Sequence, residues 1–365
     1  MKLLIVCPDW FPYSAGLAQS CYDFCQEAIK HGHEIRIITA KDKNLDPKGL
    51  DVHPLPFLFR LGGRSPIIFN LWKKIKHHIE WSDQVILYSY MFEMNSRIVL
   101  YRTLGLFDKP LIHMYRGSLE PEVLRYLSLS TKCMKWLWDE TAARFLFKNV
   151  DKTISNSKPT LSYMKKKYGV TNTVYVPNAY HLKEYKKSTQ ETKRVIFIGR
   201  LVENKGVLLF EKILRALPND WKLTIVGSGP CEPYIQKLQQ KHSNLEVKGR
   251  LPPHTFIPLL QDSSLLILPS YAEGSPRVVT EALASGVVPV AFAAGDVPTL
   301  LADGAGVSIP IGDAEAFCEA LDSLCHNDQK RKKIASKAYQ KSKKYDWKAV
   351  YPRLEKEILL NPRKL

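Results

Sequence analysis

The chain has 365 residues, of which 45% are hydrophobic, and a formal net charge of +17 at pH 7. This length allows two domains with full hydrophobic cores. No stretch approaches the roughly 18 apolar residues of a membrane-spanning helix, and the first apolar run is too short for a signal peptide, so we expect a cytoplasmic protein. Seven scattered cysteines without a C-x-x-C pair indicate reduced thiols and exclude a zinc module.

The positive charge requires an anionic partner, and nucleic acid, anionic lipid and phosphorylated small molecules all fit. Residues 1–180 carry 25 Lys/Arg and 16 Asp/Glu, and residues 181–365 carry 28 and 20. The charge is therefore spread over both halves, which excludes a single detachable basic tail.

Short apolar runs alternate with helical stretches in the first half of the chain. A helix is predicted from about Leu17 to His31, directly after the first run. The runs cover 3–7, 34–40, 84–90, 110–115, 152–157 and 173–178. Strands that alternate with helices predict a parallel α/β sheet.

The same pattern restarts after a polar interval. Residues 179–194 lack apolar periodicity and are predicted to be a linker. The later runs cover 194–199, 222–227, 245–249, 265–270, 287–292 and 307–311, and a helical tail begins near Asp313. We predict an N-terminal Rossmann-like domain over 1–178, a second one over 195–345, and a C-terminal helix over 346–365 that packs back on the first.

Two cations follow the first strand of the second half. In open α/β sheets, ligands bind beyond the carboxyl ends of the strands, and Arg200 and Lys205 are predicted to lie there, close to the start of a helix. Arginine can bind a diphosphate bidentately and lysine adds a compact charge. The alternative is a pair of ordinary surface cations on a basic protein.

The next two strands end in weaker motifs. GSGP, residues 227–230, is a G-x-G without the third glycine of a dinucleotide fingerprint, so it is either a tight strand-to-helix turn or a ligand loop. Arg250 and Leu251 precede two prolines. This rigid loop could hold a flat base against its backbone, or it could be a plain connection.

The stretch EGSPRVVTEALASG, residues 273–286, predicts a helix over 276–285 with Ser275 as N-cap and Pro276 as first helical residue. The free N–H groups at its start favour a phosphate. Glu273 in the preceding loop can reach hydroxyls, and Glu281 lies inside the helix. Considered without the other residues, Glu273 and Glu281 could instead be two solvated glutamates with no part in a site. Together with the two cations, the set predicts a site for a diphosphate, a ribose and a polyhydroxylated group.

The chain resembles the retaining, nucleotide-sugar-dependent glycosyltransferases of the GT-B fold, the "glycosyltransferases group 1" family. FIGRLVENKG resembles the family's strand–Arg–x4–Lys–Gly segment, and IVGSGP resembles its G-x-G-P turn. PSYAEGSPRVVTEALASGVVPVA resembles its E-x7-E signature, and AGLAQSCYDFCQEAIKHGHEIRIIT its glycine loop and first helix. The resemblance implies two Rossmann-like domains that face a central cleft.

The resemblance also implies roles for single residues. Arg200 and Lys205 would hold the donor diphosphate, Glu281 the nucleotide ribose, and Glu273 the hydroxyls of the donor sugar. The remaining residues implied to contact the donor are Gly16 in the N-terminal loop, which also approaches the acceptor, and the backbone around Pro276, Arg277 and Val278.

The chain departs from the family pattern in three places. Ala15 precedes Gly16 where the family often has two glycines, and Asn178-Ala179 stands where it often has Asn-Gly. In LIHMYRGSLEPE, Arg116 takes the place of a histidine that many members carry near the donor sugar. We expect Arg116 to face the cleft and His113 to lie in the strand.

The implied activity is transfer of a hexosyl group, with retention, from a nucleoside-diphosphate sugar to a hydroxyl of a glycan or lipid-linked acceptor. Cell-envelope polysaccharide or lipopolysaccharide synthesis is the expected setting. No D-x-D segment occurs, so no metal is expected on the diphosphate. A non-catalytic nucleotide-binding subunit and a nucleotide-sugar epimerase of similar fold are the alternatives. Nucleic-acid binding would rest on charge alone, since no known module occurs.

Residues 54–81 combine aromatic and aliphatic residues with lysine and arginine. WKKIKHHIEW predicts a basic helix that bears aromatic side chains. Such a face can lie on an anionic leaflet, which would make the protein peripheral on the inner face of the cell membrane. A core-facing helix with a solvated basic side is the alternative.

Overall fold

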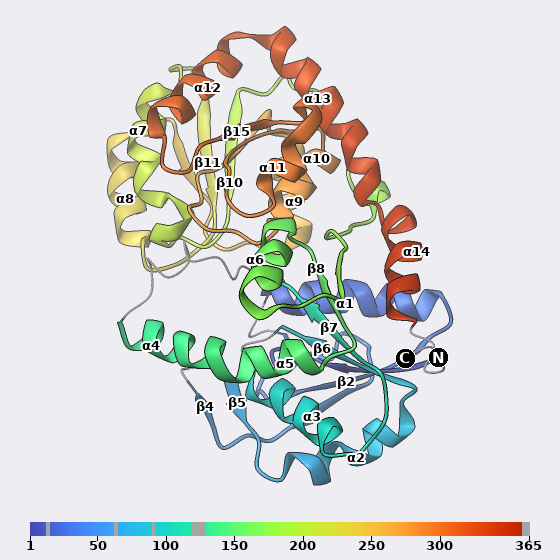
Figure 1. Ribbon diagram of the computed structural model, residues 1–365. Coiled ribbons are helices and arrows are strands. Elements are labelled where there is room, and N and C mark those ends of the chain that lie inside the picture. The colour runs from blue at the N-terminus through green and yellow to red at the C-terminus, as the bar shows by residue number, and fades with distance from the viewer. Residues whose placement is uncertain (12–14, 62–64, 90–91, 118–128, 360–365) are drawn as a thin grey trace. The chain divides into compact units, whose positions relative to one another are not determined.

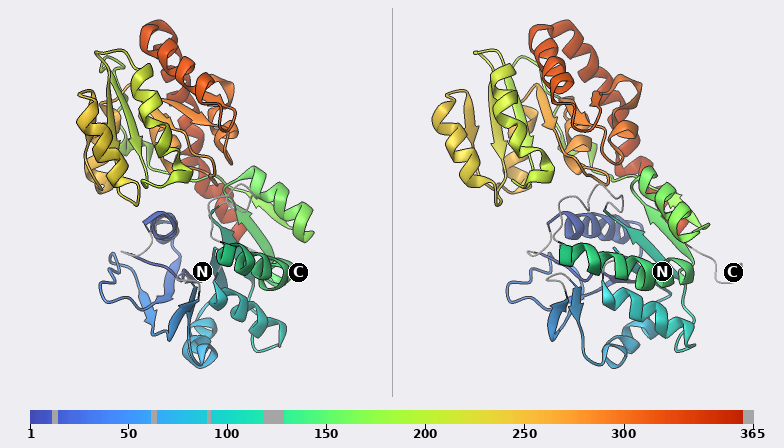
Figure 2. Two further views of the ribbon diagram at one scale, coloured as in Figure 1. Left: turned by 90° about the vertical axis from the view of Figure 1, so that its left-hand side faces the viewer. Right: turned by 60° about the vertical axis from the view of Figure 1, so that its left-hand side comes forward.

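The computed structural model describes residues 1–11, 15–61, 65–89, 92–117 and 129–359. The described chain divides into two compact units, one of residues 1–117, 129–176 and 351–359 and one of residues 177–350. Each unit is built around its own parallel sheet with helices on its faces (Figures 1 and 2). The predicted α/β fold with two Rossmann-like halves is confirmed.

The first unit contains a seven-stranded parallel sheet in the order β3-β2-β1-β6-β7-β8-β9. The strand order reverses between β1 and β6. All residues of β6 and β7 are buried, so both faces of the sheet are covered, as continuous apolar runs predict. The strands are β1 (Lys2–Val6), β2 (Glu34–Ala40), β3 (Val52–Leu55), β6 (Gln84–Tyr88), β7 (Leu111–Tyr115), β8 (Lys152–Ser155) and β9 (Thr173–Tyr175).

Helices connect these strands. They are α1 (Ala15–Lys30), α2 (Leu71–Trp81), α3 (Glu93–Thr103), α4 (Leu129–Trp138), α5 (Arg144–Asn149) and α6 (Lys158–Tyr168). A π-helical turn, η2 (Asp139–Ala143), joins α4 to α5. The basic helix predicted within residues 54–81 is confirmed as α2.

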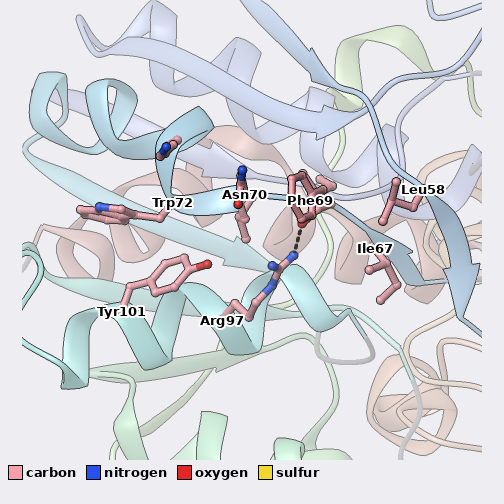
Figure 3. Close-up of a pocket in the computed structure, with 10 residues that line it drawn as sticks. Leu58, Ile67, Phe69, Asn70, Trp72, Arg97 and Tyr101 are labelled. Atoms are coloured by element: carbon pink, nitrogen blue, oxygen red, sulfur yellow. Dashed lines mark hydrogen bonds between the residues drawn. The ribbon is translucent and has the colours of Figure 1, made fainter.

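A two-stranded antiparallel hairpin, β4 (Phe59–Leu61) and β5 (Ser65–Ile67), precedes α2. The sequence did not predict it, because its strands have only three residues each. The hairpin, α2 and α3 border a pocket of about 470 Å³ (Figure 3). Residues 62–64 of the segment lie outside the described part of the chain.

His113 lies in β7, as predicted, and is fully buried. Its Nε2 donates to the carbonyl of Ser89, 2.9 Å away, which has a left-handed backbone with φ 63°. Burial lowers the pKa of His113 to about 4, although the Ser89 hydrogen bond opposes this shift.

The depressed pKa of His113 predicts a loss of stability in acid. The unfolded chain binds a proton near pH 6.5, so the stability contributed by neutral His113 falls from pH 6.5 downward and is reduced by about 3 kcal/mol at pH 4. His113→Gln, which cannot titrate, should flatten this part of the pH profile in urea unfolding. Identical pH profiles for the two proteins would contradict the assignment.

The second unit contains a six-stranded parallel sheet in the order β12-β11-β10-β13-β14-β15. Its strands are β10 (Arg194–Ile198), β11 (Lys222–Val226), β12 (Leu245–Val247), β13 (Leu265–Leu268), β14 (Val288–Phe292) and β15 (Val307–Ile309). Its helices are α7 (Phe210–Ala216), α8 (Glu232–Lys241), α9 (Pro253–Gln261), α10 (Arg277–Ala284), α11 (Val297–Leu301), α12 (Ala314–His326) and α13 (Asp328–Ser342).

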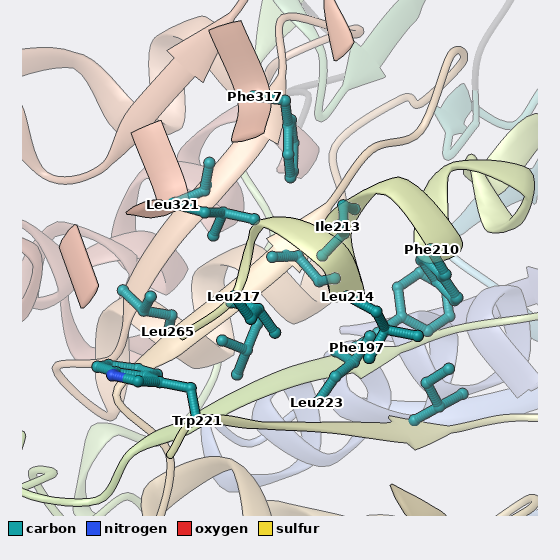
Figure 4. Close-up of a cluster of buried hydrophobic side chains, with 14 of the residues drawn as sticks. Phe197, Phe210, Ile213, Leu214, Leu217, Trp221, Leu223, Leu265, Phe317 and Leu321 are labelled. Carbon is teal, nitrogen blue, oxygen red and sulfur yellow. The ribbon is translucent and has the colours of Figure 1, made fainter. Parts of the chain in front are cut away.

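Hydrophobic cores cover both faces of this second sheet. Successive side chains of a strand point to opposite faces. Val195 and Phe197 of β10 pack with Trp221 and residues of α7 and α12 (Figure 4), whereas Ile196 packs with residues of α10. Because both faces of β10 are covered, its residues form a continuous apolar run. The packing on both faces also fixes the position of the loop that follows β10.

Residues 179–194 pack on the second unit. Tyr180 forms a β-bridge with Asp346, and a short 3-10 helix, η3 (Leu182–Glu184), follows. The hydroxyl of Ser188 donates to the Ser263 carbonyl at 2.9 Å, and Gln190 Nε2 donates to the Gly286 carbonyl at 2.8 Å. The polar side chains of this segment thus serve as hydrogen-bond donors to the unit.

The last described helix, α14 (Trp347–Ile358), joins the first unit from Tyr351 onward. Three of its residues bind side chains from different elements of that unit. Glu355 pairs with His33 at 3.0 Å, Glu357 pairs with Lys152 at 2.9 Å, and the Ile358 carbonyl accepts from Gln84 at 2.7 Å. Residues 360–365 of the predicted C-terminal helix lie outside the described residues. Among the helices of the described chain, none is long and apolar enough to cross a bilayer.

Candidate functional site

The strand order of the second sheet reverses between β10 and β13, which is where ligands bind in open α/β sheets. The structure brings two predicted residues together at this point. Lys205 ends the short 3-10 helix η4 (Glu203–Lys205) after β10, and Glu273 lies in the loop after β13. Lys205 Nζ lies 2.5 Å from Glu273 Oε1, and their side chains are only 19% and 9% exposed.

The loops that carry this pair are locked to each other. Gly206 has φ 72°, and a Cβ at this position would lie 2.0 Å from the Pro269 carbonyl oxygen. The Tyr271 N–H also donates to the Asn204 carbonyl at 2.9 Å. Only glycine permits this approach, and the close packing of the two loops positions Lys205 against Glu273.

Arg200 is exposed at the end of β10 and makes no side-chain hydrogen bond or ion pair with the described residues. Its loop is fixed by its neighbours, because the Leu201 N–H donates to the Ser228 carbonyl at 2.9 Å. A Cβ on Gly227 would lie 1.8 Å from the Gly199 carbonyl oxygen. The GSGP turn is therefore a close-packed support for the Arg200 loop.

The loop with Arg250 joins the same edge of the sheet. The Gly227 N–H donates to the Gly249 carbonyl at 2.8 Å, which places the end of β12 beside the GSGP turn. Arg250 is exposed and, like Arg200, has no side-chain partner in the described chain. Leu251 is half-buried and packs against the core on the α10 face.

Helix α10 begins at Arg277, with Pro276 at the cap position in an extended conformation, φ −70° and ψ 118°. The prediction that Ser275 caps this helix was wrong. Since Pro276 is not helical, the cap position moves to a residue without a side-chain oxygen, and no side chain caps the helix. Backbone N–H groups in the first turn, around Arg277 and Val278, therefore retain capacity for an anion.

Glu281 is buried in α10, and its Oε1 lies 3.9 Å from Nε of Arg277, one turn earlier. Tyr185 lies close to it. Burial, followed by the charge of Glu281, raises the pKa of the Tyr185 hydroxyl above its ordinary value. Tyr185 thus stays protonated and can donate a hydrogen bond.

Sequence reasoning missed two further supports of the Glu273 loop. Asn178 Nδ2 donates to the Ser275 carbonyl at 2.9 Å. A Cβ on Gly295 would lie 2.1 Å from the Glu273 carbonyl oxygen, and the Asp296 N–H donates to the Gly274 carbonyl at 2.7 Å. Gly295, three residues after the end of β14, was a usable signal, since glycine near a strand end often permits such a close approach.

The other two predicted residues belong to the first unit. Gly16 was predicted in a loop, which was wrong, because it lies in the first turn of α1 and a Cβ there would meet nothing within 4 Å. The neighbouring alanines favour helix at this position. Arg116 follows β7, and its Nη1 donates to the Val176 carbonyl at 3.2 Å. The RGSLEP segment lies outside the described residues from position 118 onward.

Comparison with known protein families identifies both halves of the chain. Residues 14–184 match the family described as Glycosyltransferase Family 4, and residues 181–341 match the family described as Glycosyl transferases group 1. Both of these families are glycosyltransferases, and the two matches together span residues 14–341. All proposed donor contacts of the second unit lie within the group 1 match.

Two curated relatives illustrate the range of proteins that the chain resembles. TuaC of Bacillus subtilis, named for teichuronic acid biosynthesis, is 30% identical over 150 residues, which cover 41% of this chain and 37% of TuaC. The chain therefore matches only about a third of that relative's length. A phosphatidyl-myo-inositol mannosyltransferase of Mycolicibacterium smegmatis is 22% identical, with 96% of this chain and 91% of the relative covered.

Solved structures share the fold of this chain along nearly its whole length. HepE of Anabaena, solved in complex with UDP, has a TM-score of 0.79 at 18% identity, and the match covers 98% of this chain and 99% of HepE. This likeness shows the GT-B fold.

Proposed function

We propose that the protein transfers a hexosyl group, with retention of anomeric configuration, from a nucleoside-diphosphate sugar to a hydroxyl of a glycan or lipid-linked acceptor. The observation that carries the proposal is the Lys205–Glu273 pair at the switch point of the second sheet. Lys205 can bind a diphosphate through its positive charge, and Glu273 can accept hydrogen bonds from sugar hydroxyls. HepE, which shares the fold, was solved with UDP and with UDP-glucose, and this supports the same class of donor here.

The proposed catalysis is electrostatic. Negative charge develops on the leaving diphosphate, and Arg200, Lys205 and the first turn of α10 stabilise it in a site prepared by the rigid loops. Because two side-chain cations supply this charge, we propose that transfer needs no metal. Activity should then survive dialysis against EDTA.

The remaining residues are assigned to binding. Glu273 would accept hydrogen bonds from the donor sugar, and Glu281 would accept them from the ribose. The other proposed donor contacts, beyond the two cations and two carboxylates, are Arg250, Leu251, Ser275, Pro276, Arg277 and Val278. In the first unit, Arg116 and Gly16 would contact the transferred sugar or the acceptor.

A thermal-shift panel of UDP, GDP, ADP and their sugars tests the donor site. A nucleotide at about 100 times its Kd should add roughly 2.7 kcal/mol to the free energy of unfolding. We expect one base to stabilise the wild type and to lose this effect in Arg200→Ala and Glu281→Ala. Arg215→Ala, an exposed arginine on α7 paired with Glu211, is the matched control. No response to any nucleotide in the wild type would contradict the proposal.

We propose cell-envelope polysaccharide or lipopolysaccharide synthesis as the setting. TuaC is named for teichuronic acid biosynthesis, and the structural neighbour WaaG is described as involved in lipopolysaccharide biosynthesis. An NMR spectrum of the product formed with the active donor would report the anomeric configuration. An inverted product would contradict the retaining assignment.

We also propose that residues 54–81 contact an anionic membrane surface. Lys73, Lys74 and Lys76 lie on α2, and each cation near such a surface adds about 1 kcal/mol of attraction. The wild type should therefore float with phosphatidylglycerol vesicles at low salt, and a variant with the three lysines changed to glutamine should not. Absence of flotation in the wild type would remove this proposal.

A further inference from the structure

We infer that the solvent-exposed face of α13 binds an acidic polysaccharide, that is, a glycan with repeated carboxylate or phosphate groups. The inference rests on the proposed function, which supplies a glycan as the polymer that the protein handles. It adds a binding surface on a helix that carries none of the proposed donor contacts, and it names the class of polymer that this surface holds.

The segment formed by α13 and the 3-10 turn after it, η7 (Lys343–Tyr345), carries a large share of the positive charge of the chain. Residues 328–345 contain seven lysines, one arginine and one aspartate, which gives +7 out of +17 for the whole chain. Figure 1 shows α13 on the outside of the second unit. Charge of one sign gathered on one element attracts a partner of the opposite sign.

Four of these lysines form a row along the helix, which we call the basic row: Lys330, Lys333, Lys337 and Lys344. All four are exposed, whereas the opposite face of α13 is buried. Helix residues three, four and seven positions apart share a face, and the row extends for roughly 20 Å. A sugar unit is nearly as long as one helical turn, so successive acidic units of a linear glycan can meet successive lysines. A single phosphate could not use such a row.

The charges of the basic row are not neutralised within the described part of the chain. The side chains of Lys333, Lys337 and Lys344 have no ion-pair or hydrogen-bond partner there. Lys330 Nζ donates only to the uncharged hydroxyl of Ser323, 2.9 Å away. The row therefore presents four ammonium groups to solvent.

The carboxylates close to α13 are occupied by other cations. Asp328 Oδ1 lies 2.8 Å from Nη2 of the buried Arg331, and Asp303 Oδ2 lies 3.3 Å from Nζ of Lys341. Neither cation belongs to the basic row. An anionic ligand on the row would therefore not have to displace an internal carboxylate.

The surface around the lysines favours a saccharide over a membrane or a nucleic acid. Ser336 and Gln340 are exposed beside the basic row and can hydrogen-bond to sugar hydroxyls. No large apolar side chain of α13 is exposed, so this helix has nothing to insert into a bilayer. Tyr339, its one aromatic residue, is half-buried with Lys187 Nζ 5.6 Å from its ring, which leaves no platform for stacked bases.

Fluorescence anisotropy of a labelled decagalacturonide, titrated with the full chain at low salt, tests the inference. We expect saturable binding that weakens as salt is added, because ionic contacts release counterions. Changing Lys333, Lys337 and Lys344 together to glutamine should weaken binding about tenfold or more. The slope of log affinity against log salt should also fall by about two.

The matched control removes the same charge from another face of the second unit. Lys222 of β11 and Lys237 and Lys241 of α8 are exposed, and changing these three to glutamine should leave binding almost unchanged. Equal loss in the two triple variants would show that only the net charge of the protein attracts the glycan, and this would overturn the inference. No binding by the wild type would also overturn it.

Two comparisons address the competing partners. Gln340→Ala changes no charge but removes a hydrogen bond to a hydroxyl, so it should weaken binding of the decagalacturonide and not of a thymidylate decamer. Tighter binding of the thymidylate decamer, lost in the α13 triple variant, would assign the basic row to nucleic acid instead. Loss of flotation with phosphatidylglycerol vesicles in the α13 variant but not in the control would assign it to a membrane. Either result would overturn the inference.

The failure of this inference can be told apart from failure of the proposed function. The thermal-shift panel measures nucleotide binding at the donor site, and none of the three lysines changed on α13 and η7 belongs to that site. A nucleotide response without decagalacturonide binding would leave the proposed function standing and reject the glycan surface.

Discussion

Arg200→Ala is expected to lower kcat for sugar transfer about 10²–10³-fold, with a smaller change in KM. Arg200 is exposed at the switch point and has no side-chain partner among the described residues, so its guanidinium is available for the diphosphate. Its strongest interaction should form as negative charge develops on the leaving group. An interaction made mainly in the transition state affects kcat more than KM. Initial rates with the donor identified by the nucleotide panel measure the effect.

Two variants separate charge from geometry. Arg200→Lys keeps the positive charge but not the planar, bidentate donor. Its kcat should therefore still be about tenfold below that of the wild type. Arg215→Ala removes an exposed arginine from α7 in the same unit and should leave the rate unchanged. Undiminished turnover by Arg200→Ala would show that another group stabilises the leaving diphosphate.

Gly206→Ala is expected to lower the free energy of unfolding of the second unit by more than about 4 kcal/mol. Its left-handed backbone alone costs a non-glycine residue about 1–2 kcal/mol. The added Cβ would also lie 2.0 Å from the Pro269 carbonyl oxygen, a backbone atom that can move only if the end of β13 moves. Urea unfolding, followed by a probe in this unit, measures the loss.

The matched control for this substitution is Gly312→Ala. Gly312 also has a positive φ, 87°, but a Cβ there would meet only a Tyr271 ring atom at 3.8 Å. Gly312→Ala should therefore lower the free energy of unfolding only by the cost of a left-handed backbone, about 1–2 kcal/mol. If both variants lost the same stability, the close packing of the loops at Lys205 and Glu273 would not be what holds the site.

The architecture could be predicted because apolar runs of strand length alternate with helices, and both sheets bury both faces. Arg200, Lys205 and Glu273 were placed correctly at strand ends for the same reason. The ion pair between Lys205 and Glu273 could not be derived from the strands alone, since it depends on β10 and β13 being neighbours although two strands separate them along the chain.

The errors arose where backbone conformation decides the outcome. Ser275 was expected to cap α10, but the extended conformation of Pro276 moved the start of the helix by one residue. Gly16 was expected in a loop, although nothing near its Cα requires glycine. The β4–β5 hairpin has three-residue strands, which are too short to produce a readable alternation of apolar and polar residues.

The helix α14 has a consequence for synthesis on the ribosome. The described part of the second unit is the stretch 177–350, whereas the described part of the first unit includes residues 351–359 as well as residues before 177. Gln84, Lys152 and His33 meet their partners on α14 only when residues 355–358 have been made. The half that is translated first therefore gains these contacts only after the described part of the second unit has been translated.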